Sequence, residues 1–339
     1  MEDVGVRDNF FELGGHSLLA VRLFAEIAKR LGRQLPLVTL FQAPTVEGLA
    51  RLLREAGGEP AWSALVPIQP GGARPPLFCV HQHTGHLFCY RDLARHLGPD
   101  QPAYGLGARG LDGIQAPWTR IEEMAAHYVQ EIRALQPEGP YHLAGYCFGG
   151  AVAFEMAQQL RREGQTVALL ALIEASWAGH AHPLRQAVRR VRRRIAFERA
   201  QMGPLTAPEQ LRYLVGKATR AAVEQAAGLL ERVAARRPRL RPEVSSVERA
   251  IRRVETAHLV AIRHYVPDVY PGRLALFRHA RPSARRHGDP TWGWGALATG
   301  GIDVHEIPGN RPTIVDEPDV RILAERLTKC LEAAGAARE

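Results

Sequence analysis

The sequence has few cysteines and lacks any long apolar run. No stretch reaches about 18 uninterrupted apolar residues, which argues against a membrane-spanning helix. The acidic start MEDVGVRDNFFE is unlike a secretory signal peptide. The four cysteines lack C-x-x-C spacing, which argues against a zinc site or a disulfide framework; they are Cys79, Cys89, Cys147 and Cys330. We therefore expect a cytoplasmic protein with reduced thiols, no bound metal and no membrane partner.

A nucleic-acid reading module is also missing, although the net charge is +9. Arginines are dense in RQAVRRVRRRIAFER, residues 185–199, and again in RVAARRPRLRP. These runs belong to no recognisable reading motif and carry no pattern of interleaved aromatic residues. We therefore expect no nucleic-acid partner and interpret the arginines as a solvated helical face. Attraction of an anionic substrate or carrier is the alternative.

The 339 residues leave room for one large domain and one small one. In residues 1–56, SLLAVRLFAEIAKRLG and TVEGLARLLREA have helical periodicity, and LPLVTLFQ between them is predicted to be extended. Glycine and proline predict a linker over residues 57–66. In residues 67–339 strands alternate with helices, which predicts an α/β domain with a parallel sheet. Its predicted strands are PLFCVH, AYGLG, YHLAGY, VALLALIE, RLALFRH and IDVHEIPG, and residues 177–264 are predicted to form a helical insertion, or lid.

The segment HLAGYCFGGAVAFEMAQQL joins a strand, a glycine-flanked turn and a helix. Its centre, Gly145-Tyr146-Cys147-Phe148-Gly149, fits the nucleophile elbow G-x-S-x-G with cysteine in place of serine. The glycines leave room in a crowded turn that pushes the nucleophile out at the sheet edge. The pattern therefore predicts Cys147 as a nucleophile, with a buried structural cysteine as the alternative.

The stretch DNFFELGGHSLLA closely resembles the attachment motif of peptidyl and acyl carrier proteins from assembly-line synthetases. The resemblance implies that Ser17 carries 4′-phosphopantetheine, added by a phosphopantetheinyl transferase. Ser17 begins a predicted helix after two glycines, where a phosphodiester would meet free N–H groups; an ordinary helix N-cap is the alternative. Only sixteen residues precede Ser17, so residues 1–56 resemble a partial four-helix carrier domain without its first helix. Upstream synthetase modules and a tethered peptidyl substrate are the implied partners.

The remainder resembles the terminal thioesterase domain of nonribosomal peptide and polyketide synthetases. The resemblance lies in PPLFCVH, YRDLARHLGPDQPAYGLGARGLDG, YHLAGYCFGG, HYVPDVYPGRLALFR and GIDVHEIPG. It implies an α/β-hydrolase fold with a helical lid, preceded by the small helical carrier domain. It also implies that an acyl chain moves from the carrier's pantetheine thiol to the enzyme nucleophile, and then to water or to an internal nucleophile.

In this family the nucleophile is followed along the chain by an acid and then a histidine. The segment LALIEAS puts Glu174 at the acid position. The usual P-G-x-H histidine is absent, because the sequence there reads Pro308-Gly309-Asn310-Arg311. Arginine remains protonated and cannot act as a general base.

The loop HQHTGH occupies a place that ordinarily supplies one N–H of the oxyanion hole. We therefore predict His83 or His86 as the displaced base, and the backbone N–H groups of His83 and Phe148 as the oxyanion hole. Two alternatives remain open: both histidines are merely polar loop residues, or the base comes from the lid, at His180 or His182.

A cysteine thiol ionises more readily than a serine hydroxyl, with an unperturbed pKa of about 8.5. A thioester acyl-enzyme also stays activated, which favours a difficult ring closure. Together with the displaced histidine and the upstream carrier, Cys147 resembles the nucleophile of monobactam (sulfazecin-type) thioesterases. That resemblance implies β-lactam formation on an N-sulfonated peptide, with Arg311 as a candidate sulfonate contact. Hydrolytic release, macrocyclisation and an inactive docking module are the alternatives.

Overall fold

The computed structural model describes residues 4–15, 17–33, 35, 37–55, 63–177, 245–280, 289–308 and 314–336. All of them belong to one of the two compact units of the chain, which comprises residues 1–180 and 245–339. Most of the predicted lid, including His180 and His182, lies outside the described residues, and so does Arg311. None of the described helices is long and apolar enough to span a bilayer.

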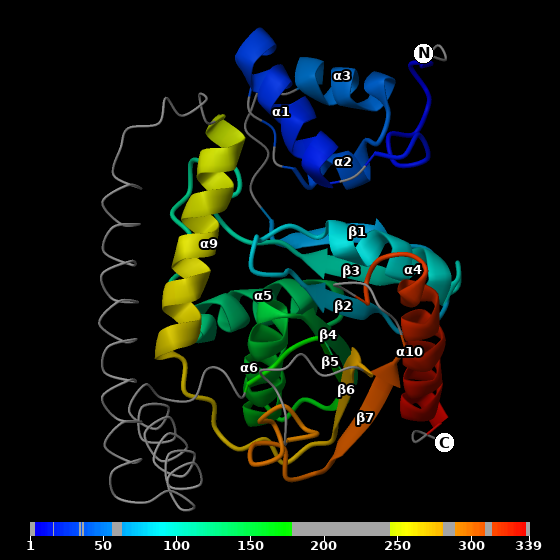
Figure 1. Ribbon diagram of the computed structural model, residues 1–339, viewed down its shortest axis with the longest axis vertical. Coiled ribbons are helices and arrows are strands. Elements are labelled where there is room, and N and C mark those ends of the chain that lie inside the picture. Colours follow the sequence, from blue (N-terminus) through cyan, green and yellow to red (C-terminus); the bar gives the residue numbers. More distant parts are fainter. Residues whose placement is uncertain are drawn as a thin grey trace, which may run out of the picture. The chain divides into compact units, whose positions relative to one another are not determined.

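The N-terminal part is helical, as predicted (Figure 1). It contains α1 (Ser17–Leu31), α2 (Thr39–Gln42) and α3 (Val46–Glu55). The prediction of an extended LPLVTLFQ is wrong, because this segment includes α2. Leu37 and Leu40 are both almost fully buried with Phe24, and a helical turn puts residues three apart on one face.

The larger part contains a seven-stranded sheet with the order β1-β3-β2-β4-β5-β6-β7. Its strands are β1 (Leu65–Gln69), β2 (Leu77–Val80), β3 (Ala103–Leu106), β4 (Tyr141–Tyr146), β5 (Val167–Ile173), β6 (Leu274–His279) and β7 (Ile302–Ile307). All six predicted strands are present and parallel, whereas β1 is antiparallel to β3. β1 begins inside the predicted linker. The strand forms because Val66 is buried against the sheet, and its start was missed because the glycines and prolines around it hide the apolar pattern.

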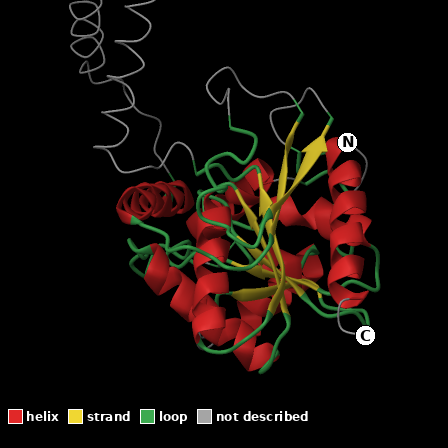
Figure 2. Cartoon of the chain, turned by 90° about the horizontal axis from the view of Figure 1, so that it is seen from below, coloured by secondary structure: helices red, strands yellow, loops and turns green. Residues whose placement is uncertain are grey.

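Helices cover both faces of the sheet (Figure 2). One core contains side chains of α5 (Ile121–Leu135) and α6 (Phe148–Arg162), and the other contains side chains of α4 (Arg91–Leu97) and α10 (Asp319–Ala336). Alternate residues of β2 enter opposite cores, as expected for a strand buried on both faces. A short 3-10 helix, η1 (Phe88–Tyr90), precedes α4.

The described end of the predicted lid is helical. Helix α9 (Ser246–His264) begins with a capping box, in which Ser245 and Glu248 each accept a hydrogen bond from the other's backbone N–H. Its buried side chains include Val254 and His258, whereas its last residue, His264, is exposed. The helix therefore packs against the α/β domain along one face only.

Candidate functional site

Three chemically active side chains occur at the carboxyl ends of three neighbouring strands. Cys147 follows β4, Glu174 follows β5, and His279 is the last residue of β6. The N–H of Cys147 donates to the carbonyl of Ile173 at 2.9 Å, and the N–H of Glu174 donates to the carbonyl of Phe277 at 2.8 Å. The sheet therefore brings these residues to one edge, where ligands of parallel α/β sheets bind.

Cys147 has the strained backbone expected of a nucleophile elbow. Its φ and ψ are 54° and −113°, a region that non-glycine residues seldom adopt, and its side chain is exposed. A Cβ on Gly145 would lie 2.3 Å from the carbonyl oxygen of Gly149, and one on Gly149 would lie 2.5 Å from that of His81. Both glycines are therefore required for the tight turn into α6.

Glu174 contacts a histidine that the sequence reasoning did not select. Its Oε1 accepts the backbone N–H of His279 at 2.7 Å and lies 3.0 Å from Nδ1 of the same residue. The two side chains are only 15% and 13% exposed, respectively. With Nδ1–H facing the carboxylate, the neutral ring has its lone pair at Nε2. Nε2 is buried and has no hydrogen-bond partner in the described part of the chain.

This contact was missed because RLALFRH was interpreted only as a strand. A histidine at the carboxyl end of a buried strand, two strands from the nucleophile, was the available signal. Recognising it requires the order of the strands, which the sequence pattern alone does not give. The contact joins residues 105 positions apart.

The two histidines predicted as bases contact residues other than Glu174. The His83 ring is 52% exposed and its Nε2 lies 4.0 Å from Glu255 of α9. The His86 ring lies 3.3 Å from Nε2 of Gln82, and burial, with a smaller effect of His83, lowers its pKa to about 4. Among the described residues neither ring contacts Glu174, so the structure does not join them to the predicted acid.

One predicted oxyanion-hole residue, Phe148, is part of the elbow, and the other, His83, is in the loop after β2. Phe148 is the first residue of α6, so its N–H has no acceptor within the helix. His83 is in the turn closed by the N–H of Gly85, which donates to the carbonyl of Gln82 at 2.9 Å. The close approach of Gly149 to His81 puts this loop directly against the elbow.

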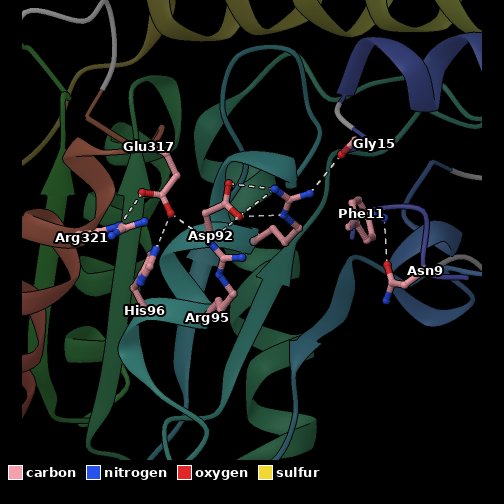
Figure 3. A network of polar contacts seen from close by, with 9 residues as sticks. Asn9, Phe11, Gly15, Asp92, Arg95, His96, Glu317 and Arg321 are labelled. Atoms are coloured by element: carbon pink, nitrogen blue, oxygen red, sulfur yellow. Dashed lines mark hydrogen bonds and ion pairs between the residues drawn. The ribbon is translucent and has the colours of Figure 1, made fainter. Parts of the chain in front are cut away.

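The surroundings of Ser17 fit a phosphodiester. Ser17 is the first residue of α1, whose first turn contains no acidic residue to repel an anion. Gly14 has a φ of +85°, and Arg91 donates from its guanidinium to the carbonyl of Gly15 at 3.1 Å while it is also paired with Asp92 (Figure 3). Backbone N–H groups and a nearby cation are the donors that a phosphate requires.

A cavity of about 260 Å³ extends between this region and the elbow. Its lining includes Phe11 and Gly15 of the N-terminal part and Tyr146, which precedes Cys147. Phe88 and His86 also line it. The cavity thus gives a partly apolar space lined by both the N-terminal part and the strand that ends at the elbow.

Comparison with known families gives two matches. Residues 75–331 match the thioesterase domain family, and residues 1–53 match the phosphopantetheine attachment site family. The chain is 48% identical over 178 residues to malpibaldin synthetase of Mortierella alpina, covering 52% of this chain and 3% of that protein. It is 31% identical over 348 residues to chondramide synthase cmdD of Chondromyces crocatus, covering 96% of this chain and 8% of that protein. The chain therefore spans only a small part of the length of these relatives.

Solved structures share the fold. A four-domain nonribosomal peptide synthetase, crystallised in its holo form with AMP and glycine, aligns with a TM-score of 0.59 and 28% identity over 96% of this chain and 24% of that one. The NocB thioesterase domain, in covalent complex with a fluorophosphonate nocardicin G analogue, aligns with a TM-score of 0.53 and 23% identity over 79% of this chain and 99% of that one. The α/β-hydrolase fold with a preceding carrier domain, predicted from sequence, is confirmed.

Proposed function

The chain belongs to the thioesterase domain family, with a phosphopantetheine-attachment domain ahead of it, and we propose that it releases the finished peptide from a nonribosomal peptide synthetase. The synthetases among its relatives support this assignment. Upstream modules, a tethered peptidyl substrate and a phosphopantetheinyl transferase are the proposed partners.

The contact between Glu174 and His279 carries the proposal of an active enzyme. Neighbouring strands are about 4.8 Å apart, so β4 and β6 are separated by about 10 Å with β5 between them. Cys147 and His279 therefore flank the strand that precedes Glu174, and the carboxylate lies 3.0 Å from Nδ1 of the imidazole, which leaves Nε2 as the basic nitrogen. We therefore assign Cys147 as nucleophile, His279 as general base and Glu174 as the group that orients the base. His83 and His86 remain the alternative bases.

When bound at Ser17, phosphopantetheine supplies a thiol that holds the acyl chain as a thioester. His279 accepts the Sγ proton of Cys147 at Nε2, and the thiolate attacks the thioester carbonyl carbon. The N–H groups of Phe148 and His83 stabilise the oxyanion. His279 then returns the proton to the departing sulfur, and the acyl group remains on Cys147 as a new thioester.

The second step is proposed to be ring closure. An internal nitrogen attacks the carbonyl carbon of the acyl-Cys147 thioester while His279 accepts its proton, and Cys147 leaves. A thioester retains activation that a serine ester loses, which suits a strained ring, and an N-sulfonate makes the N–H more acidic. β-Lactam formation on an N-sulfonated peptide is therefore the proposed reaction, with Arg311, outside the described residues, as candidate sulfonate contact. Hydrolysis and macrocyclisation are the alternatives.

The test loads Ser17 with a peptidyl-pantetheine that ends in N-sulfonated diaminopropionate and identifies the released product by mass. We expect a ring, one water lighter than the linear acid. Release should be abolished by Cys147→Ala and lowered about 100-fold or more by His279→Asn, since general base catalysis contributes about 10²- to 10⁴-fold. The exposed histidine of α9 supplies the matched control, His264→Asn.

Three other outcomes would contradict parts of the assignment. Release of the linear acid alone would exclude β-lactam formation and leave a hydrolase. A greater loss of product release in His83→Ala or His86→Ala than in His279→Asn would identify a loop histidine as the general base. Absence of any acyl group on Cys147 in the folded protein would support a docking module.

A further inference from the structure

A buried histidine of α9 contacts both parts of the proposed oxyanion hole. His258 is 2% exposed, and its Nδ1 lies 2.7 Å from the carbonyl oxygen of His83. Its ring packs on that of Phe148, with centroids 4.4 Å apart and planes inclined by 15°. It also packs on the ring of His81 at 4.8 Å and 15°. One side chain therefore joins the loop after β2 to the first residue of α6.

The other two rings of this cluster are themselves fixed. His81 is fully buried, with Nδ1 2.7 Å from the carbonyl of Gln82 and Nε2 2.9 Å from the hydroxyl of Tyr128. The ring of Phe148 is tied to the elbow, because its residue directly follows Cys147. His258 thus packs on one ring with a polar contact at each nitrogen and on one that belongs to the residue after the nucleophile.

Helix α9 holds the same loop at two further points. A Cβ on Gly85 would lie 2.9 Å from Cγ1 of Val254, so the helix packs closely on the turn. Glu255 lies 4.0 Å from the ring of His83. These contacts and that of His258 come from consecutive turns of one helix face.

We propose that His258 is a positioning residue that sets the oxyanion hole by holding the backbone of His83 and the ring of Phe148 in one arrangement. The inference rests on the proposed function, since it assumes acyl transfer to Cys147. As a hydrogen-bond donor to a carbonyl, Nδ1 carries the proton. Burial lowers the pKa of His258 to about 4, so the ring is neutral at pH 7 and does not act through a charge.

The inference is tested with two reactions of Cys147 that differ in one respect. Acylation by p-nitrophenyl acetate passes through an oxyanion, and its nitrophenolate burst measures the rate. Alkylation by iodoacetamide occurs at a saturated carbon and forms no oxyanion, so it reports only the nucleophile and its base. Cys147→Ala supplies the background for both reactions in the full chain.

Two variants separate the hydrogen bond from the ring. His258→Phe keeps a stacking ring without the donor, and His258→Asn keeps a donor near the position of Nδ1 without the ring. We expect His258→Phe to slow acylation about 100-fold, comparable to loss of one oxyanion donor, and to leave alkylation within about twofold. His258→Asn should recover about tenfold of that loss, because its amide still donates to the carbonyl of His83. His264→Phe, at the exposed end of α9, should change neither rate.

An equal loss of both reactions in His258→Phe, or no loss of acylation, would overturn the inference. If His258→Phe does not fold, as judged by its thermal unfolding, His258→Gln misplaces the donor and carries the same comparison with the same criteria. Failure of the proposed function has a different signature. In that case the wild-type protein would show no burst that depends on Cys147, whatever residue stands at 258.

Discussion

Replacing Glu174 by glutamine tests how the carboxylate acts. Oε1 of Glu174 accepts the backbone N–H of His279 and lies 3.0 Å from Nδ1 of its ring. Glutamine has nearly the same shape, and its single carbonyl oxygen can accept the same two donors. The backbone N–H at 2.7 Å opposes a flip of the amide, since a flip would set its NH₂ group against that N–H. The ring should therefore keep its proton on Nδ1.

The magnitude follows from what glutamine removes. A hydrogen bond to a charged group contributes about 1.5–3 kcal/mol, and a neutral one about 0.5–1.5 kcal/mol. Losing the charge opposite the protonated ring of the transition state should therefore cost about 1.4 kcal/mol, which is about tenfold in rate. By contrast, an amide that forces the wrong tautomer costs about 10⁴-fold in a serine protease triad.

The assay is the p-nitrophenyl acetate burst at pH 7, with Glu174→Ala as the comparison that removes both acceptors. We expect about a tenfold loss for glutamine and a larger loss for alanine. A loss near 10⁴-fold for glutamine would refute the argument that the backbone N–H fixes the amide. An unchanged rate would show that Glu174 does not orient the base.

Three further predictions concern the elbow and the buried histidines. Cys147→Ser should form less ring and more linear acid by product mass, because a serine ester is less activated; an unchanged ratio would contradict this. Gly149→Ala should lower stability by about 1–3 kcal/mol in urea unfolding, because its Cβ meets the carbonyl of His81 at 2.5 Å. His86 and His258 have folded pKa values of about 4, below the unfolded value, so stability should be present above pH 6.5 and fall between about pH 6.5 and 4, less steeply in His258→Asn. Parallel pH profiles of the two proteins would exclude His258 from this effect.

Much of the fold could be predicted because its signals are local. Most strands of the parallel sheet are apolar runs, and each helix has its own period, so a short window is sufficient to identify them. The wrong predictions occurred where the local sequence pattern favoured a different structure. LPLVTLFQ is rich in residues that favour strands, yet burial of Leu37 and Leu40 on one face requires a helical turn. The start of β1 was assigned to the linker because prolines and glycines surround it.

The sequence by itself determined the chemistry that one turn can contain. The motif before α1 predicts Ser17 as the attachment residue, and the glycines around Cys147 predict the elbow, because the steric demands of such turns arise from adjacent residues. Only the tertiary structure decided which histidine meets Glu174. His279 reaches the carboxylate because β6 lies beside β5 in the sheet, and His258 reaches the loop because α9 packs on it. Strand order and helix packing are set by burial over the whole domain, and no short stretch of sequence encodes them.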